Sequence, residues 1–339
     1  MGVVQGSYSF SHSPVKPWRT IVDCDPGIDD ALAIALLAVS PEFDLRAVTT
    51  VCGNVPVELA TENAIRVLHA CGRGEVPVCP GAARPLVRAN PPYPPIHGRN
   101  GLGEVELPAV AAARSAEPAI AAFERVLEPA APGEITVIAL APLTNLALLL
   151  SLRPDLADRI GLLATMGATI DRGNVTPFAE FNVWADPEAA YRVLSEGDLP
   201  TRLFTLAATR RAALDEPQRL ELAAWSPIGA SLAEMILGYD DQVTGAGWPL
   251  HDALVVAGLL EPEIVELRAA ATIEVDTSSG PRRGATAVTW EGVHVLGNPV
   301  GDKGHGPPRR TLEVAVDGDP ERFRGLLRER IRRCGSASC

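Results

Sequence analysis

The 339-residue sequence is poor in positive charge. It has 30 Lys and Arg against 42 Asp and Glu, which gives a formal net charge of −12 at pH 7, and it has no run of Lys or Arg. A protein that binds the phosphates of nucleic acid needs a basic face, so the composition argues against a nucleic-acid partner. Small polar substrates and metal cations suit this charge better.

Long apolar runs and paired cysteines are also absent. No stretch approaches the roughly 18 apolar residues of a membrane span, and residues 1–17 are Ser-rich without the apolar core of a signal peptide. The six cysteines include no CxxC pair and no metal-site spacing. We therefore expect no membrane partner, reduced thiols rather than a disulfide framework, a cytoplasmic location, and disordered ends at 1–17 and 334–339.

Strand-like and helix-like segments alternate along most of the chain, and 47% of the residues are hydrophobic, enough for a large core. The expected strands are 20–24, 45–51, 76–79, 135–140, 162–166 and 202–206. The expected helices are 29–39, 57–71, 188–194, 251–260 and 322–332. This alternation predicts an α/β fold, a single large domain over 18–333 with a mainly parallel central sheet flanked by helices, as in Rossmann-like open sheets. Ligands bind such sheets outside the carboxyl ends of the strands.

Four carboxylates directly follow the first expected strand. They are Asp23, Asp25, Asp29 and Asp30, within eight positions. Like charges this close repel one another, and a buried carboxylate is costly unless it is paired or bound to a cation. The turn at 26–27 lets Asp25 and Asp30 converge, and their hard oxygen ligands suit Ca²⁺ or Mg²⁺ rather than zinc or copper. A solvated cluster that caps a helix is the alternative.

Two polar motifs further along the chain are candidates to complete this site. His251 and Asp252 begin an expected helix, although an adjacent His and Asp also serve as a simple cap there. Glu180 and Asn182 alternate with apolar residues at period two, so both should point the same way and could fix a polyhydroxylated ligand. A half-buried edge strand with its polar side in water is the other interpretation of this segment.

Two irregular segments interrupt the pattern of strands and helices. Residues 85–103 are Pro-rich, and residues 240–249 are rich in Gly and Asp; either could be a loop beside the site or a plain surface loop. His97 lies in the first of them, where a lone His is usually solvated. Asn54 lies just past the second expected strand, at the edge of the sheet where ligands bind.

Taken in order, these motifs resemble those of the inosine–uridine-type nucleoside N-ribohydrolases. They are Asp-Cys-Asp-Pro-Gly-Ile-Asp-Asp-Ala at 23–31, Thr-Thr-Val-Cys-Gly-Asn at 49–54, His-Gly at 97–98 with Gly-Leu-Gly at 101–103, Ala-Pro-Leu-Thr-Asn-Leu-Ala at 141–147, Met-Gly at 166–167, Gly-Asn at 173–174 with 177–182, and His-Asp at 251–252. The resemblance covers about residues 20–332. It implies a nucleoside hydrolase-like fold and Ca²⁺-dependent hydrolysis of the N-glycosidic bond of small-molecule ribonucleosides to free base and ribose. It also implies a homodimer or homotetramer that serves nucleoside salvage.

The resemblance assigns roles to individual residues. The implied Ca²⁺ ligands are Asp25, Asp30, Asp252 and the backbone carbonyl of Leu140. Asp25 would also be the general base that activates a metal-bound water, and His251 the acid near the leaving base. The implied ribose contacts are Asp29, Asn54, Asn174, Glu180, Asn182 and Asp252, with Met166 against the sugar and His97 beside it. Asp23 would support the site from behind.

The sequence departs from the family's pattern in three places. Ala168 stands where the family more commonly has a second Gly after Met-Gly, and the segment 205–209 lacks the acidic residue that many relatives carry. The segment 239–249 is shorter than in relatives whose tyrosines cover the base. Tyr239 and Trp248 could stack on a nucleobase or simply pack. These departures leave the metal and ribose residues intact and leave the choice of base open.

Two other functions compete with this interpretation. Asp23 and Asp25 have the Asp-x-Asp spacing of phosphoryl-transfer hydrolases, although no hydroxyl residue or phosphate-binding Lys follows them as such sites require. A non-catalytic protein that binds a nucleoside or Ca²⁺ would keep the same acidic cluster without turnover.

Overall fold

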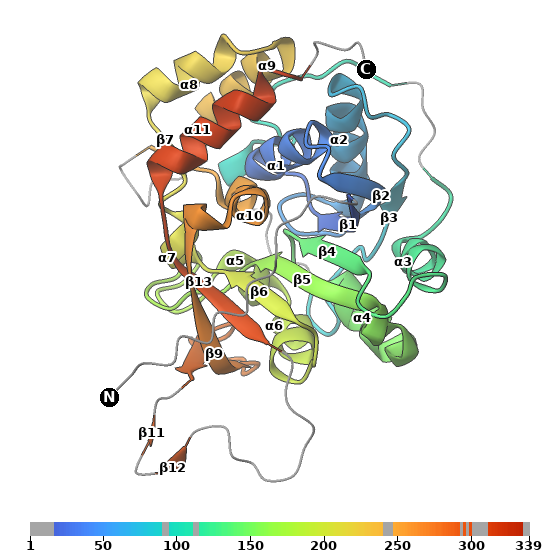
Figure 1. The fold of residues 1–339 in the computed structure, drawn as a ribbon, viewed down its shortest axis with the longest axis vertical. Coiled ribbons are helices and arrows are strands. Elements are labelled where there is room, and N and C mark those ends of the chain that lie inside the picture. Colours follow the sequence, from blue (N-terminus) through green and yellow to red (C-terminus); the bar gives the residue numbers. More distant parts are fainter. Residues whose placement is uncertain are drawn as a thin grey trace.

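The structure is a computed structural model, and it describes residues 17–89, 95–110, 115–239, 247–291, 294–295, 298–299 and 311–334. A nine-stranded sheet runs through the middle of the molecule (Figure 1). Its strands, in spatial order, are β10 (Thr286–Trp290), β9 (Val265–Val275), β13 (Leu312–Gly318), β6 (Thr201–Phe204), β5 (Ile160–Met166), β4 (Ile135–Ala139), β1 (Trp18–Cys24), β2 (Phe43–Thr50) and β3 (Val78–Pro80). Two short pairs lie outside it: β7 (Ala213–Leu214) with β8 (Trp248–Pro249), and β11 (His294–Val295) with β12 (Asn298–Pro299).

The sheet is mainly parallel, as the sequence predicts. Every neighbouring pair from β13 to β3 is parallel, whereas β9 runs antiparallel to both β13 and β10. From β1 the chain continues to β2 and β3 on one side, and then returns to β4, β5 and β6 on the other. The strand order therefore reverses between β1 and β4, which is the position where open α/β sheets bind ligands.

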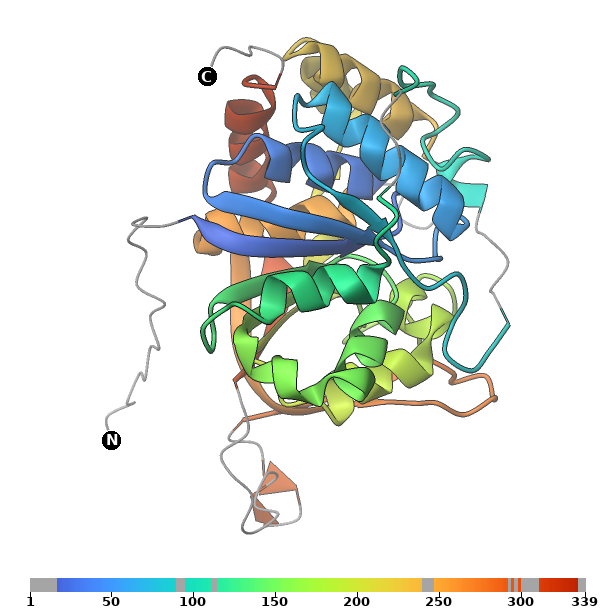
Figure 2. The same cartoon turned by 90° about the vertical axis from the view of Figure 1, so that its right-hand side faces the viewer.

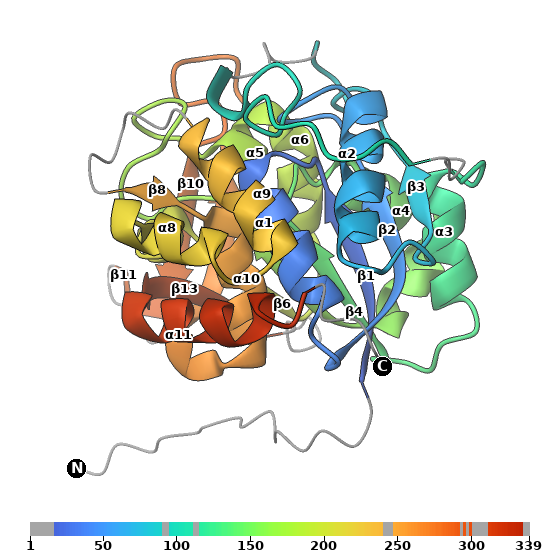
Figure 3. The same cartoon turned by 90° about the horizontal axis from the view of Figure 1, so that it is seen from above.

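Helices cover both faces of the sheet (Figure 2). One layer, seen from above in Figure 3, contains α1 (Ile28–Ala38), α2 (Val57–Ala70), α8 (Glu216–Ala223), α9 (Pro227–Leu237), α10 (His251–Leu260) and α11 (Pro320–Ile331). The other contains α3 (Ala119–Leu127), α4 (Thr144–Leu152), α5 (Phe181–Ala185) and α6 (Pro187–Ala190). The short elements are α7 (Leu206–Thr209), the 3-10 helices η1 (Pro95–His97), η2 (Pro154–Arg159) and η4 (Pro262–Ile264), and the short π-helix η3 (Tyr191–Ser195).

The two layers explain why β1 is buried from Thr20 to Cys24. Val22 packs into the core cluster that contains α1 and α10, and Ile21 packs into the cluster that contains α3 and α4. A parallel strand buried on both faces has no solvated side and needs no polar alternation. Every residue of α1 is buried, so the core fixes the helix whose first turn carries Asp29 and Asp30.

The sequence predicts most of the central elements and is wrong at two points. The interpretation of residues 178–182 as a half-buried edge strand is wrong, because Glu180 is the N-cap of α5 and its carboxylate accepts from the backbone N–H groups of Asn182 and Val183. Cys334 was predicted in a disordered tail, but it is buried against the core that includes α11. The predictions for 1–16, 335–339 and most of 240–249 lie outside the described residues. Within the described ranges, no helix is both long and apolar enough to cross a membrane.

Candidate active site

The candidate site lies where the strand order reverses. Asp25 directly follows β1, and Leu140 directly follows β4. The two strands are in register as far as Asp23 and Ala139, and the backbone N–H of Leu140 then donates to the Asp23 carbonyl at 2.8 Å. The chain therefore leaves both strands at the same edge of the sheet, where Asp25 and the Leu140 carbonyl were predicted to meet.

The turn between β1 and α1 is held by its own carboxylates. The Asp30 carboxylate accepts from the backbone N–H of Gly27 at 3.0 Å and from that of Asp25 at 3.3 Å. Asn54, which follows β2, donates its backbone N–H to Asp25 Oδ2 at 2.6 Å and its side-chain amide to Asp30 Oδ2 at 3.2 Å. A Cβ at Gly53 would lie 1.8 Å from Asp25 Oδ2, so this close approach requires glycine.

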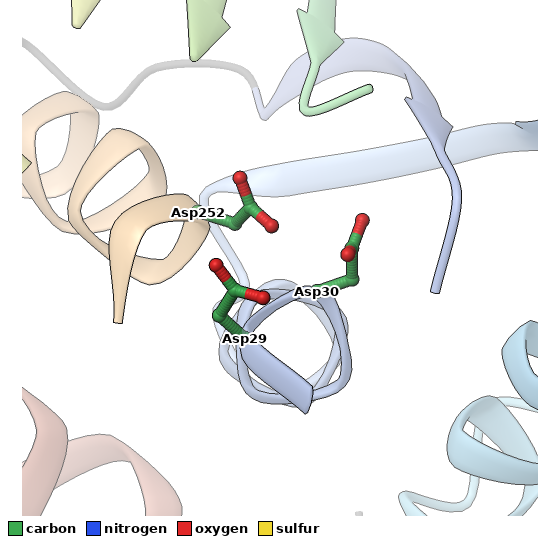
Figure 4. Close-up of side chains that lie close together, drawn as sticks. All are labelled: Asp29, Asp30 and Asp252. Carbon is green, nitrogen blue, oxygen red and sulfur yellow. The ribbon is translucent and has the colours of Figure 1, made fainter. Parts of the chain in front are cut away.

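Asp252 completes an acidic cluster of residues far apart in sequence. Carboxylate oxygens of Asp29, Asp30 and Asp252 lie within 4.8 Å of one another, and all three residues are buried. Figure 4 shows the three side chains converging from the first turns of α1 and α10. The tight packing of these two helices places the two turns side by side.

The electrostatics of this cluster call for a cation. Burial, with the repulsion of Asp30, raises the pKa of Asp29 to about 8 and that of Asp25 well above its usual range. Burial, with the charge of Asp29, likewise raises the pKa of Asp252 well above its usual range. Asp25 Oδ1 and Asp29 Oδ1 are buried and have no hydrogen-bond partner among the described residues. Buried, crowded and partly unpaired oxygens fit a hard divalent ion such as Ca²⁺.

Two buried histidines border the cluster. His97 accepts the backbone N–H of Ile28 at its Nδ1, 3.2 Å away, and its ring lies 5.2 Å from that of Tyr239. Its Nδ1 is 4.0 Å from Asp29 Oδ1, but burial lowers the pKa of His97 to about 3, so the ring is neutral and the contact is not an ion pair. His251 Nδ1 is 2.7 Å from Thr209 Oγ1. Burial also lowers the pKa of His251 to about 3.

The end of β5 and the start of α5 form the opposite wall of the site. Asn182 donates its side-chain amide to the Leu140 carbonyl at 2.9 Å and lies 3.6 Å from the Met166 sulfur. Glu180 accepts three backbone N–H groups, from Asn182, Val183 and Ala168, and burial still raises its pKa to about 7.

Asn174 lies in the loop between β5 and α5, and its Oδ1 is a further buried atom without a partner among the described residues. The loop is held from outside by the guanidinium of Arg210, which donates to the carbonyls of Arg172 and Gly173. An unpaired buried oxygen of this kind can accept a ligand hydroxyl.

Other side chains around the site are structural. Asp23 Oδ1 accepts from Thr49 Oγ1 and Asn145 Nδ2 behind the cluster, and burial raises the pKa of Asp23 to about 7. Trp248 is half-buried against the core, with the Arg219 guanidinium 5.9 Å from the centre of its ring. These contacts agree with a supporting role for Asp23 and with packing at Trp248.

No sequence pattern singles out Asn63 or Thr209. Asn63, on α2, donates its amide to the carbonyls of Pro26 and Asn100, and so joins the β1–α1 turn to the loop that carries His97. Thr209 contacts His251 as described above. Short polar side chains within helices are ordinary in a sequence, so only the fold reveals these two contacts.

A buried acidic cluster at the reversal point of a parallel sheet is an arrangement that can bind a cation and a polar ligand together. Comparison with known proteins identifies the family. The sequence profile described as "Inosine-uridine preferring nucleoside hydrolase" matches residues 20–325. The chain belongs to this nucleoside hydrolase family and is an enzyme of the N-glycosidase class, as the motifs predict.

Individual relatives agree with this placement. The non-specific ribonucleoside hydrolase RihC of Klebsiella pneumoniae is 37% identical over 92% of this chain and 97% of its own length. The pyrimidine-specific ribonucleoside hydrolase RihA of Escherichia coli is 35% identical over the same shares. The solved structure of a purine-preferring ribonucleoside hydrolase from Gardnerella vaginalis has a TM-score of 0.81 at 29% identity, over 93% of this chain and 98% of that one. The predicted fold is therefore confirmed.

Proposed function

We propose that this enzyme hydrolyses the N-glycosidic bond of ribonucleosides in a Ca²⁺-dependent reaction that gives free base and ribose. The observation that carries the proposal is the convergence of Asp29, Asp30 and Asp252 beside the unpaired oxygen of Asp25. The relatives named above act on purine or pyrimidine ribonucleosides, which supports the substrate class. They differ in base preference, so we assign none here.

The proposed Ca²⁺ ligands are Asp25, Asp30, Asp252 and the Leu140 carbonyl. All of them are hard oxygen donors, and the pKa of each of the three carboxyl groups is raised by burial in a way that a bound cation would reverse. The Leu140 carbonyl accepts one hydrogen bond, from Asn182, and keeps a second lone pair. Bound Ca²⁺ would supply a Lewis acid that acidifies water and orients the ribose diol.

Asp25 would act as the general base. Its Oδ2 is held by the Asn54 N–H, whereas its Oδ1 is left to take the proton of the attacking water. As water attacks the anomeric carbon, the C–N bond breaks and its electron pair leaves with the base. The sugar gains oxocarbenium character, which nearby carboxylate and amide oxygens stabilise.

The remaining predicted residues would bind the two ends of the substrate. The proposed ribose contacts are Asp29, Asn54, Asn174, Glu180, Asn182 and Asp252, with Met166 and His97 beside the sugar. His251 would assist the departure of the base. Holding the sugar in one orientation can by itself remove several kcal/mol of barrier.

A phosphoryl-transfer function is disfavoured by the position of Asp23. Such chemistry needs both Asp23 and Asp25 at the substrate, but Asp23 lies within β1, and its Oδ1 is engaged by Thr49 and Asn145. The family match points in the same direction.

A substrate panel tests the proposal. Purified protein is incubated with inosine, uridine, cytidine and adenosine, and free base is measured by chromatography with Ca²⁺, after exhaustive chelation, and after Ca²⁺ is restored. We expect base release from at least one nucleoside, loss of that activity on chelation, and recovery on restoration. Tight nucleoside binding without base release at any pH from 5 to 9 would instead establish a non-catalytic binding protein.

A further inference from the structure

The hydroxyl group of Thr209 contacts His251 beside the proposed active site. Thr209 is the last residue of α7 and is fully buried. Its Oγ1 lies 2.7 Å from Nδ1 of His251, and this is its only hydrogen bond within the described ranges. The opposite ring nitrogen, Nε2, has no hydrogen-bond partner among the same residues, so it is the edge of His251 that a ligand can reach.

The backbone holds these two side chains in place independently of their own contact. The N–H of Leu250, the residue before His251, donates to the Ala212 carbonyl at 3.0 Å, and β7 pairs with β8 immediately beyond. The start of α7 is tied to the site wall because the Leu206 N–H donates to the Ala168 carbonyl at 3.1 Å. The short distance from Thr209 to His251 is therefore a property of the scaffold and not of a loose side-chain rotamer.

This contact distinguishes the two neutral forms of His251. If Nδ1 carried the proton, the Thr209 oxygen would accept it, and the buried hydroxyl proton would have no acceptor within the described residues. If Nε2 carries the proton, Thr209 donates to Nδ1, and the donor without a protein partner is the Nε2–H on the edge that a ligand can reach. A buried donor without an acceptor is costly, so the second form is favoured.

We propose that Thr209 is a positioning residue that keeps the proton of neutral His251 on Nε2, aimed as a hydrogen-bond donor at the departing base. The inference rests on the proposed function and refines the role of His251 within it. The C–N electron pair leaves with the base, and the hydrogen bond from Nε2 stabilises the developing negative charge. No proton leaves the imidazole: Asp25 takes the proton of the attacking water, and the released base takes one from solvent.

Thr209→Val tests the inference because it keeps the shape and removes the hydroxyl. Thr205→Val is the matched control: Thr205 precedes the same short helix, is equally buried, and donates to the Ala315 carbonyl without touching His251. Each variant is assayed on the nucleoside that the wild type cleaves best and on 4-nitrophenyl β-D-ribofuranoside, whose leaving group needs no donor.

We expect Thr209→Val to lower kcat on the nucleoside about tenfold with KM changed less than about twofold, and to leave the nitrophenyl riboside unaffected. Thr209→Ser should restore the nucleoside rate, and Thr205→Val should leave both substrates unchanged. Equal losses on the two substrates, or the same pattern in Thr205→Val, would reveal a merely structural role and overturn the inference.

Nitrogen-15 NMR of labelled histidine provides a readout independent of activity. The wild type should show a protonated, pyrrole-like Nε2 and a pyridine-like Nδ1 at His251, with the resonance assigned by its loss in His251→Gln. A proton on Nδ1 in the wild type overturns the inference even if the enzyme is active. Absence of nucleoside cleavage by the wild type contradicts the proposed function instead, while the NMR result still decides where the proton lies.

Discussion

Asp186 and the acidic cluster at the reversal of the sheet are both buried, but they differ in how far their carboxylate oxygens are hydrogen-bonded. Asp186, between α5 and α6, is fully buried, but both of its oxygens are engaged. Thr144 Oγ1 donates to it at 2.7 Å, the Leu86 N–H at 2.9 Å and the Ala189 N–H at 3.1 Å. Each of these hydrogen bonds lowers the pKa of Asp186 against the effect of its burial.

The acidic cluster at the reversal of the sheet is buried to the same degree without being satisfied. Asp25 and Asp29 each keep an unpaired oxygen, and each is raised in pKa by a neighbouring carboxylate as well as by burial. Burial alone therefore does not mark a functional carboxylate. A functional carboxylate is marked by an unpaired oxygen that faces other negative charges, because only a bound ligand can offset the free-energy cost of desolvating that oxygen.

Asp25→Asn tests the proposed catalytic role of the unsatisfied carboxylate of Asp25. The substitution keeps the size of the side chain and removes the base, so we expect kcat to fall about 10³-fold. The variant should remain folded, since it also removes one of four repelling charges. Steady-state base release and circular dichroism at a matched protein concentration measure the two effects.

Asp186→Asn is the control for this first prediction because it neutralises an equally buried carboxylate outside the site. Full activity in Asp25→Asn, or an equal loss of activity in both variants, would contradict the role of Asp25 as the base.

Removal of the metal should change the stability of the folded protein in a pH-dependent way. In the metal-free protein the pKa values of the proposed ligands Asp25, Asp30 and Asp252 are raised, so the stability that these carboxyl groups contribute is present below the usual carboxyl pKa of 3.8 and is lost as the pH rises through their raised values. Ca²⁺ binding requires the ionised carboxylates and should therefore stabilise the protein more at pH 8 than at pH 5. The total stabilisation is about 4 kcal/mol where free Ca²⁺ is 1,000 times the dissociation constant.

Thermal unfolding with a chelator and with excess Ca²⁺, at both pH values, measures this difference. A Ca²⁺-induced rise in Tm that is equal at pH 5 and pH 8 would show that the raised carboxylates are not the ligands.

Asp186→Asn should itself reduce stability without changing the reaction. The amide can still accept at one oxygen, but its NH₂ group faces the donors Leu86 N–H or Thr144 Oγ1. Loss of these hydrogen bonds should cost about 1–3 kcal/mol of unfolding free energy, with kcat changed less than about twofold. Urea unfolding measures the loss of stability, and the base-release assay measures kcat. A large loss of kcat in a folded variant would show that the role of Asp186 is not merely structural.

The sequence predicts the parts of this comparison that depend on local patterns. The strands β1, β2, β4, β5 and β6 are mostly buried and rich in apolar residues, and the density of Asp after β1 indicates a cation. The strand β9, which lies between β10 and β13, was missed because charged and half-exposed residues interrupt it. Glu180 shows a different limit: period two suggested a strand, whereas its carboxylate caps a helix. Contacts between distant segments, such as Asn63 with Asn100, leave no local signal.

Ala168 gives the smallest expected effect and separates backbone strain from ligand binding in the site wall. It has φ +64°, a left-handed conformation that costs a non-glycine residue roughly 1–2 kcal/mol, and its N–H donates to Glu180. Ala168→Gly would relieve this strain. It would also lose a buried methyl group worth about 0.8 kcal/mol and add about 0.4–1 kcal/mol of unfolded-chain entropy. These contributions nearly cancel, so the unfolding free energy should change by less than about 1 kcal/mol, with the Glu180 contact kept.

Urea unfolding and KM for the preferred nucleoside measure the result. A KM that falls tenfold or more in this variant would mean that the Ala168 methyl group obstructs the ribose.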